Sequence, residues 1–255
     1  MSTTTTNLLI TGANRGLGLG LVKKFLRLPN HNIIAFVRDP SSPSSQALTT
    51  LPKDPSTNII IIPHYDASQW DSAAQAVKTL QFEHKITKID TVIANAGIAK
   101  VYPLIKDVDP KDIREHFEIN VLGPIALFQA TRDLLYAAKD QNPEKQPIFA
   151  WMGSGAGSLS NQIDVPSAAY APTKTMLNWY GVRLHVEEDW LVTFILDPGW
   201  VRTEMGNAAA QLWGLEHANL TIEESVGGMF EVMRGATREK YGGRLVEYTG
   251  KIEDW

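Results

Sequence analysis

Short apolar runs alternate with amphipathic stretches along the whole chain. Runs typical of strands buried in a parallel sheet lie at residues 7–10, 33–37, 59–62, 91–94, 148–152 and 191–196, and 243–248 would add a last strand. Helical patterns lie at 19–28, 69–82, 110–138, 170–187 and 222–235. This alternation predicts an α/β fold, a doubly wound parallel sheet with helices on both faces.

No internal repeat divides the chain, and the segment richest in serine and proline, residues 40–55, is typical of a surface loop after the second strand. The chain of 255 residues has the length of one well-buried α/β domain. We therefore expect residues 1–255 to form a single domain.

The first strand leads directly into a glycine-rich loop and then into a helix. Residues 11–18 read Thr-Gly-Ala-Asn-Arg-Gly-Leu-Gly. Glycine lets the backbone turn tightly and approach a pyrophosphate, and a helix N-terminus offers unpaired N–H groups and a positive dipole. An ordinary glycine-rich turn is the alternative, but the strand and helix on either side favour a dinucleotide site. Its expected contacts are Gly12, Asn14, Arg15, Gly16, Leu17 and Gly18.

Tyr170 and Lys174 stand four residues apart, one turn along the same face of a predicted helix. Pro172 indicates that the helix begins close to Tyr170, because proline is tolerated mainly in the first turn. A nearby ammonium group would lower the pKa of the phenol and make it a tuned acid or base. Taken alone, such a pair is more often a solvated helix face.

Together with four further segments, these motifs resemble the short-chain dehydrogenase/reductase family. The glycine loop has the spacing Gly-x-x-x-Gly-x-Gly, and the matching segments downstream are Asn95-Ala96-Gly97, Ile119-Asn120-Val121, Ser154 within 152–157, and the turn at 198–203. The resemblance implies a Rossmann fold of about seven strands in the order 3-2-1-4-5-6-7. Within the family, residues 168–174, 177–179 and 196–207 resemble the fungal group that includes norsolorinic acid ketoreductase.

The resemblance also implies roles for individual residues. Ser154, Tyr170 and Lys174 would be catalytic, and Asn120 would hold a water near the lysine. The cofactor would also contact Asp66, Asn95, Ala96, Gly97, Tyr170, Lys174, Pro198, Gly199, Val201 and Thr203. No metal is expected.

The catalytic serine has a rival in this chain. Ser154 lies sixteen residues before Tyr170, a longer interval than is usual in the family, so residues 158–166 must bulge. Ser158 is therefore a second candidate. We favour Ser154, because Gly-Ser-x-x-Gly at the end of the fifth strand matches the family motif.

The end of the second strand favours NADP(H) over NAD(H). Arg38 follows this strand, where a dinucleotide enzyme places an arginine for the 2′-phosphate or an acid for the 2′-hydroxyl. Arg15 offers a second set of donors suited to phosphate. The alternative is that Arg38 is merely solvated and that Asp39 holds the ribose.

These assignments predict an NADPH-dependent ketoreductase. Residues 200–220 would form a substrate lid, and Trp200, Met205, Leu212 and Trp213 suit a hydrophobic or aromatic ketone of the polyketide type. Two alternatives remain open: oxidation of a secondary alcohol by the same residues, and a nucleotide-binding sensor without turnover.

Composition narrows the partners. The net charge is −4 and there is no cysteine, so neither nucleic acid, an anionic membrane, a disulfide nor a thiolate metal site is expected. No apolar run approaches the length of about 20 residues that a membrane span needs. We expect a cytoplasmic enzyme and, from the family resemblance of helices 110–138 and 170–187, a homodimer or homotetramer.

Overall fold

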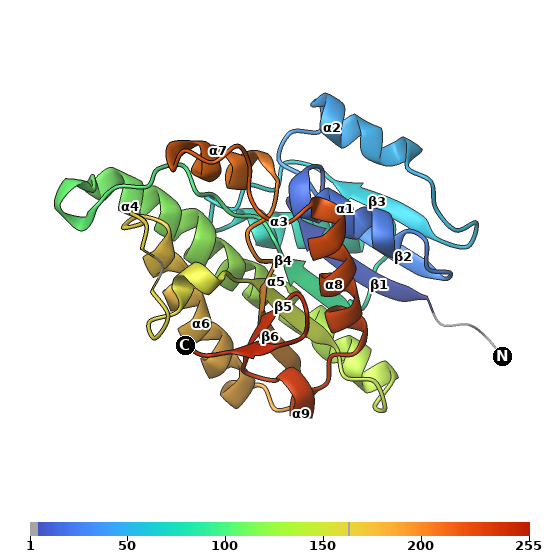
Figure 1. Cartoon of the computed structure of the whole chain (residues 1–255). Helices are drawn as coiled ribbons and strands as arrows, with labels where there is room; N and C mark the ends of the chain where they lie inside the picture. Colours follow the sequence, from blue (N-terminus) through green and yellow to red (C-terminus); the bar gives the residue numbers. More distant parts are fainter. Residues whose placement is uncertain (1–4, 163) are drawn as a thin grey trace.

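One eight-stranded sheet runs through the computed structural model, which describes residues 5–162 and 164–255. The strand order is β3-β2-β1-β4-β5-β6-β7-β8 (Figure 1). The strands are β1 Thr6–Thr11, β2 His31–Phe36, β3 Asn58–Ile62, β4 Thr91–Ala94, β5 Ile148–Met152, β6 Val192–Asp197, β7 Leu245–Glu247 and β8 Ile252–Glu253. The first seven pair in parallel, which confirms the predicted order.

Two strands differ from the sequence prediction. β8 was not foreseen: it pairs antiparallel with β7, with Glu253 opposite Leu245, and a two-residue strand carries too short a pattern to detect. The run at 59–62 was expected to be buried on both faces. It forms β3 at the edge of the sheet, and Asn58, Ile59, Ile60 and Ile61 are only partly covered or exposed, since an edge strand has a neighbour on one side only.

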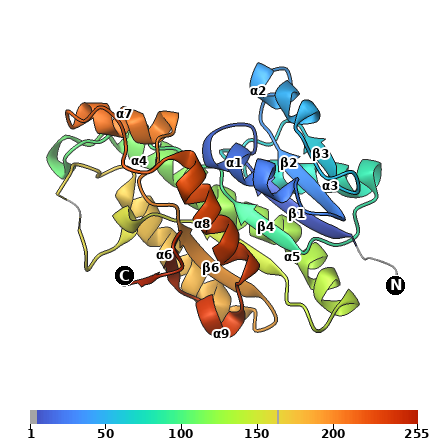
Figure 2. The ribbon, with the colours of Figure 1, turned by 45° about the vertical axis from the view of Figure 1, so that its right-hand side comes forward.

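Helices cover both faces of the sheet and bury two apolar layers (Figures 1 and 2). α3, α5 and α6 pack on one face, and α1 and α8 pack on the other. The helices are α1 Gly16–Phe25, α2 Pro43–Gln46, α3 Ser72–His84, α4 Pro110–Phe117, α5 Gly123–Gln141, α6 Ala171–Glu187, α7 Glu204–Leu212, α8 Ile222–Arg234 and α9 Arg238–Tyr241.

The helix predicted at 110–138 is interrupted. α4 and α5 are joined by a wide π-type turn, Glu118–Leu122, in which one turn contains an extra residue. Asn120 lies within this turn and is buried. The apolar periodicity continues across the turn, so the sequence pattern could not reveal it.

Helix starts follow their capping signals. Thr221 begins α8 with a capping box, in which its hydroxyl accepts from the backbone of Glu224 and the Glu224 carboxylate accepts from the backbone of Thr221. α6 begins at Ala171 with Tyr170 as the preceding cap residue and Pro172 in its first turn. The predicted start of this helix is confirmed.

The glycine loop is tightly packed against its own helix, and this contact gives a test of stability. A Cβ atom at Gly18 would lie 2.2 Å from the carbonyl oxygen of Gly12 and 2.7 Å from Nδ2 of Asn95. We expect Gly18→Ala to lower the unfolding free energy by about 1–3 kcal/mol, the usual cost of overpacking.

Gly227 in α8 is the matched control, because a Cβ there meets no atom within 4 Å. Gly227→Ala should raise the unfolding free energy by up to about 1 kcal/mol through helix propensity. Urea denaturation measures both variants, and equal effects would contradict the close packing at Gly18.

Candidate active site

The glycine loop forms an open cradle at the carboxyl edge of the sheet. Gly12 and Gly16 have φ values of +62° and +52°, a conformation that L side chains rarely adopt. α1 begins at Gly16, and the residue before it, Arg15, places no side-chain cap on the helix. The first backbone N–H groups of α1 can therefore bind an anion, and this arrangement fits the pyrophosphate of a dinucleotide.

Asn95 holds the glycine loop in place through hydrogen bonds to Thr11. Its Nδ2 donates to the carbonyl oxygen of Thr11 at 2.8 Å, and the Thr11 hydroxyl accepts from the backbone N–H groups of Asn95 and Ala96 at 3.0 and 2.9 Å. The end of β4 is thereby joined to the end of β1. The side chain of Asn95 serves the protein backbone here, while Ala96 and Gly97 continue along the cradle.

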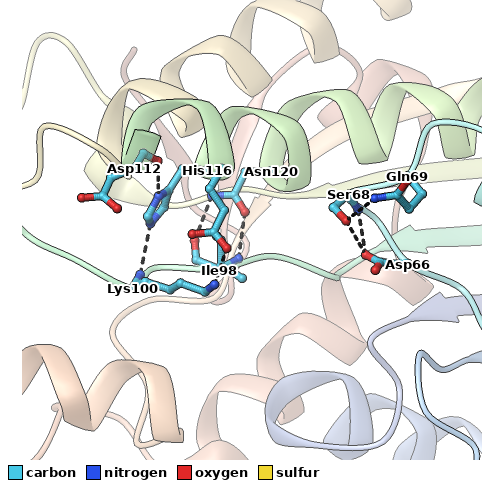
Figure 3. A network of polar contacts seen from close by, with 9 residues as sticks. Asp66, Ser68, Gln69, Ile98, Lys100, Asp112, His116 and Asn120 are labelled. Atoms are coloured by element: carbon cyan, nitrogen blue, oxygen red, sulfur yellow. Dashed lines mark hydrogen bonds and ion pairs between the residues drawn. The ribbon is translucent and has the colours of Figure 1, made fainter. Parts of the chain in front are cut away.

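Asn120 holds the segment that follows β4 (Figure 3). Its Oδ1 accepts from the backbone N–H of Ile98 at 2.8 Å, and its Nδ2 donates to the Ile98 carbonyl at 2.9 Å and to the Thr173 hydroxyl at 3.1 Å. Gly97 lies against this amide, because a Cβ there would be 3.1 Å from Oδ1 of Asn120 and 3.8 Å from Nζ of Lys174. Asn120 thus joins the cradle to α6.

His116 supports the same segment and was not foreseen from the sequence. It is fully buried on α4, its Nε2 accepts from the backbone N–H of Lys100 at 3.1 Å, and its Nδ1 lies 2.7 Å from the Asp112 carbonyl (Figure 3). Its place one helical turn before Asn120 was the available signal.

Alternating glycines let the Ser154 turn approach its surroundings closely. A Cβ at Gly153 would lie 2.2 Å from Cγ2 of Ile195, and one at Gly157 would lie 2.7 Å from the backbone carbon of Lys174. The Gly157 carbonyl also accepts from the Thr175 hydroxyl at 2.9 Å and from Nδ2 of Asn178 at 3.2 Å. The turn is therefore fixed against both β6 and α6.

This packing brings Ser154, Tyr170 and Lys174 together. The Ser154 hydroxyl lies near enough to the Tyr170 phenol to lower its pKa, and it accepts from the backbone N–H of Ala156 at 3.2 Å. Nζ of Lys174 lies 5.6 Å from the centre of the Tyr170 ring and donates to the Met152 carbonyl at 2.8 Å. All three predicted side chains lie together, after the carboxyl end of β5 and at the start of α6.

Burial decides the ionisation of these groups. It raises the pKa of Tyr170 well above its usual range, and the hydrogen bond from Ser154 only partly opposes this. Burial also lowers the pKa of Lys174 to about 8, against the smaller opposing effect of Asp197. The pKa of Tyr170 is therefore raised, not lowered as the spacing to Lys174 predicted, because desolvation has the largest effect on this phenol.

Ser158 occupies a different environment from Ser154. Its buried hydroxyl lies 3.2 Å from the Ser160 hydroxyl and accepts from the backbone N–H of Asn161 at 3.1 Å. Residues 159–162 and 164–169, between Ser158 and Tyr170, form no helix or strand, and the backbone N–H of Ser160 donates to the Trp255 carbonyl at 2.7 Å. Ile163, within this segment, lies outside the described residues.

Polar residues around the glycine loop are divided between several partners. Asn14 donates to the hydroxyls of Ser44 and Ser45 at 2.9 and 3.1 Å. Arg15 forms an exposed ion pair of 2.6 Å with Glu204, which ties the loop to α7. Asp66 accepts from the backbone and hydroxyl of Ser68 at 3.0 and 2.8 Å (Figure 3).

Arg38 and Asp39, the two candidates at the end of β2 for contact with the cofactor ribose or its phosphate, have different surroundings. Arg38 is exposed. The Asp39 carboxylate accepts from both the hydroxyl and the backbone N–H of Ser41, at 2.6 and 2.8 Å, and these bonds lower its pKa.

The turn after β6 leads into α7. Gly199 has a φ of +73°, and the Thr203 hydroxyl caps α7 by accepting from the backbone N–H of Gly206 at 3.1 Å. Val201 forms a bridge with Leu220 that closes the base of the segment. Pro198 accepts from the buried hydroxyl of Ser225 at 2.7 Å.

An aromatic cluster joins α7 to the loop after β4. The Trp213 ring centre lies 5.4 Å from that of Trp200 and 5.5 Å from that of Tyr102. Burial raises the pKa of Tyr102, and its phenol lies near enough to Tyr170 to affect the charge there. Tyr102 was not foreseen, because it stands alone in an irregular loop. Met205 and Leu212, by contrast, are largely exposed.

Known proteins resemble this chain over most of its length. The family model described as short chain dehydrogenase matches residues 6–211. The chain belongs to the short-chain dehydrogenase family. Norsolorinic acid ketoreductase nor1 of Dothistroma septosporum is 36% identical over 94% of this chain and 89% of its own length, and norsolorinic acid ketoreductase of Aspergillus parasiticus is 34% identical over 94% and 88%.

A solved structure agrees with this membership. An NADPH-bound carbonyl reductase from chicken fatty liver superposes with a TM-score of 0.88 at 29% identity, covering 100% of this chain and 96% of its own. The short-chain dehydrogenase described here is therefore an oxidoreductase whose relatives include ketoreductases.

Within residues 5–162 and 164–255, no helix is both long and apolar enough to cross a membrane. The same residues contain no group of three or more His, Asp or Glu side chains placed to hold a metal ion.

The buried charge of Lys174 predicts a pH-dependent stability. Its pKa in the fold is about 8 and its ordinary value is 10.5, so the unfolded chain binds the proton more tightly. The unfolding free energy should therefore rise with pH, and this residue should contribute about 1–2 kcal/mol between about pH 7 and about pH 9.5. Denaturation of the protein alone and of Lys174→Met measures the difference; identical pH slopes would contradict a depressed pKa.

Proposed function

We propose that this protein is an NADPH-dependent ketoreductase that acts on a hydrophobic or aromatic small-molecule ketone. The observation that carries the proposal is the convergence of Ser154, Tyr170 and Lys174 at the end of β5 and α6. These groups lie beside the glycine cradle, to which Asn120 and Gly97 connect them.

The polar groups at the end of β2 support NADP(H). Arg38 is exposed there, and its planar guanidinium suits a 2′-phosphate. Asp39 is engaged with Ser41, which leaves its carboxylate poorly placed to accept from a ribose hydroxyl. Arg15 lies in the glycine loop and is paired with Glu204. If its guanidinium left Glu204 for the 2′-phosphate, it would supply a second positive charge there. The carbonyl reductase with the similar structure is described as NADPH-bound.

The remaining cofactor contacts follow the edge of the sheet. The backbone N–H groups at Gly16, Leu17 and Gly18 would hold the pyrophosphate. The adenine and nicotinamide ends would meet a set of residues that comprises Gly12, Asn14, Asp66, Asn95, Ala96, Gly97, Pro198, Gly199, Val201 and Thr203. Bound there, the nicotinamide supplies the hydride.

The side chains of the protein handle the proton. Tyr170 gives its proton to the carbonyl oxygen of the ketone, and its raised pKa keeps that proton in place at neutral pH. The Ser154 hydroxyl donates a hydrogen bond to the same oxygen and stabilises the developing negative charge. Lys174 would hold the nicotinamide ribose, and Asn120 would support a water that returns the proton to Tyr170.

The aromatic cluster supports the substrate class. Trp200, Trp213 and Tyr102 form a cluster of rings, of which Tyr102 lies near Tyr170, and a planar apolar ketone can pack against such rings. Residues 200–220 would act as the lid. Two relatives are named as ketoreductases of norsolorinic acid, which favours a ketone of secondary metabolism. Oxidation of the corresponding alcohol would use the same residues in reverse.

A homodimer or homotetramer remains a prediction. Met176, Trp179, Val182 and Val186 are exposed on α6, and their spacing places them along one side of the helix. Such an apolar stripe would suit contact with a second copy.

Turnover tests the reaction and the serine together. The wild-type protein should oxidise NADPH in the presence of aromatic ketones. Tyr170→Phe should lose most of this activity, and Ser154→Ala should lose about 10²–10³-fold in kcat, the usual effect of removing one oxyanion donor. Ser158→Ala is the control and should keep its turnover. Normal ketone reduction by Tyr170→Phe would contradict the role of Tyr170 as proton donor. Loss of turnover in Ser158→Ala but not in Ser154→Ala would make Ser158 the catalytic serine. Tight NADPH binding without turnover of any ketone would favour a sensor.

Cofactor preference tests Arg38 separately. Wild-type kcat/KM should favour NADPH over NADH, and Arg38→Ala should reduce the preference about tenfold, as expected for one lost charge-assisted contact of about 1.4 kcal/mol. Arg27→Ala, which removes an exposed arginine elsewhere on the surface, should leave the preference unchanged. A preference for NADH that Arg38→Ala does not alter would refute the claim.

A further inference from the structure

Two carboxyl groups meet behind the Ser154 turn. Asp197 ends β6 and Glu253 lies in β8. A Cβ atom at Gly155 would be 3.1 Å from Oδ2 of Asp197 and 3.9 Å from Oε2 of Glu253. Both side chains therefore reach the same side of the turn that presents Ser154.

Asp197 joins two turns of the site. Its Oδ1 accepts from the backbone N–H of Gly199 at 3.0 Å, and the backbone N–H of Gly155 lies near enough to this carboxyl group to lower its pKa. Glu253 completes the set with a hydrogen bond between the two carboxyl groups. The turn after β5 and the turn after β6 are thus held through one side chain, which is 6% exposed.

The surroundings are more acidic than basic. Glu247 of β7 lies opposite Asp197 in the sheet and adds negative charge. Lys251 precedes β8 and lowers the pKa of Glu253 only weakly. Lys174 of α6 and Tyr170, which precedes this helix, lie near Asp197. Among the described residues, no cation forms an ion pair with either carboxyl group.

Two carboxyl groups in contact cannot both ionise at low cost, so one keeps its proton. Burial raises the pKa of Asp197 as well, but its backbone donors oppose this shift and favour its charged form, so we assign the proton to Glu253. Burial and the neighbouring acids raise the pKa of Glu253 to about 7. Its Oε2 is buried and accepts from no donor among the described residues, which fits a protonated oxygen that donates to Asp197.

We propose that Glu253 and Asp197 are positioning residues for the reduction, and that the single proton they share keeps the Ser154 turn and the Pro198-Gly199 turn in register. Loss of this proton at alkaline pH places two negative charges in contact. The carboxyl groups then separate, the turns lose their common support, and turnover falls. This role rests on the proposed ketoreductase function, although neither carboxyl group touches the reacting atoms.

The test is the pH profile of kcat with NADPH and a reducible aromatic ketone. Glu253→Gln keeps a donor toward Asp197 at every pH, so the ratio of its kcat at about pH 8.5 to that at about pH 6 should exceed the wild-type ratio at least about threefold. Glu253→Ala should lower kcat about tenfold at both pH values and leave the KM for NADPH within about twofold. Asp254→Asn, which removes the adjacent exposed charge, should keep the wild-type profile.

A second measurement does not need turnover. A raised pKa means that the native state holds the proton of Glu253 more tightly than the unfolded chain does. This contribution to the unfolding free energy is complete below the ordinary value of 4.5 and is lost as pH rises through about 7. The loss should be absent in Glu253→Gln.

The outcomes separate the two proposals. An active wild-type enzyme whose pH profile and stability slope are both unchanged in Glu253→Gln overturns the positioning role alone. A wild-type protein that reduces no ketone overturns the proposed function and this role with it, even if the stability slope is present.

Discussion

Backbone packed directly on backbone is the constraint on which the site depends. At Gly18 and Gly157 a methyl group would collide with the main chain of a neighbouring segment. These contacts determine how far α1 stands from the start of the glycine loop and how far the Ser154 turn stands from α6. The catalytic side chains acquire their geometry from these distances, because Ser154 is carried by the turn while Tyr170 and Lys174 are carried by the helix.

Once the segments are this close, desolvation governs the charges between them. The phenol of Tyr170 holds its proton more tightly, and the ammonium of Lys174 holds its own less tightly, than either would in water. The two shifts move the proton affinities of the phenol and the ammonium apart, and each shift favours the uncharged form of its group. A phenol that keeps its proton at neutral pH suits a site where a carbonyl oxygen must gain a proton as it gains electrons.

Short sequence patterns predicted much of the fold and the catalytic residues, whereas features that depend on contacts distant in sequence could not be predicted. The apolar runs predicted seven strands, the family resemblance predicted their order, and Pro172 predicted where α6 begins. The family motifs named Ser154, Tyr170 and Lys174, which the fold brings together. Tyr102, His116 and Glu253 escaped, since each reaches the site through contacts distant in sequence and none belongs to a repeating pattern. The pKa of Tyr170 was expected to fall, because spacing reveals a neighbouring charge but does not reveal how much water the fold removes.

The wide turn between α4 and α5 limits how this chain can change in length. Because the extra residue is absorbed within this turn, removing one residue from Glu118–Leu122 would leave a regular helix that still holds Leu127, Leu134 and Leu135 against the sheet. The amide of Asn120 would move instead, since its bonds to Ile98 and Thr173 depend on the wider turn. A shortened chain would therefore keep its core and lose the link between the segment after β4 and α6.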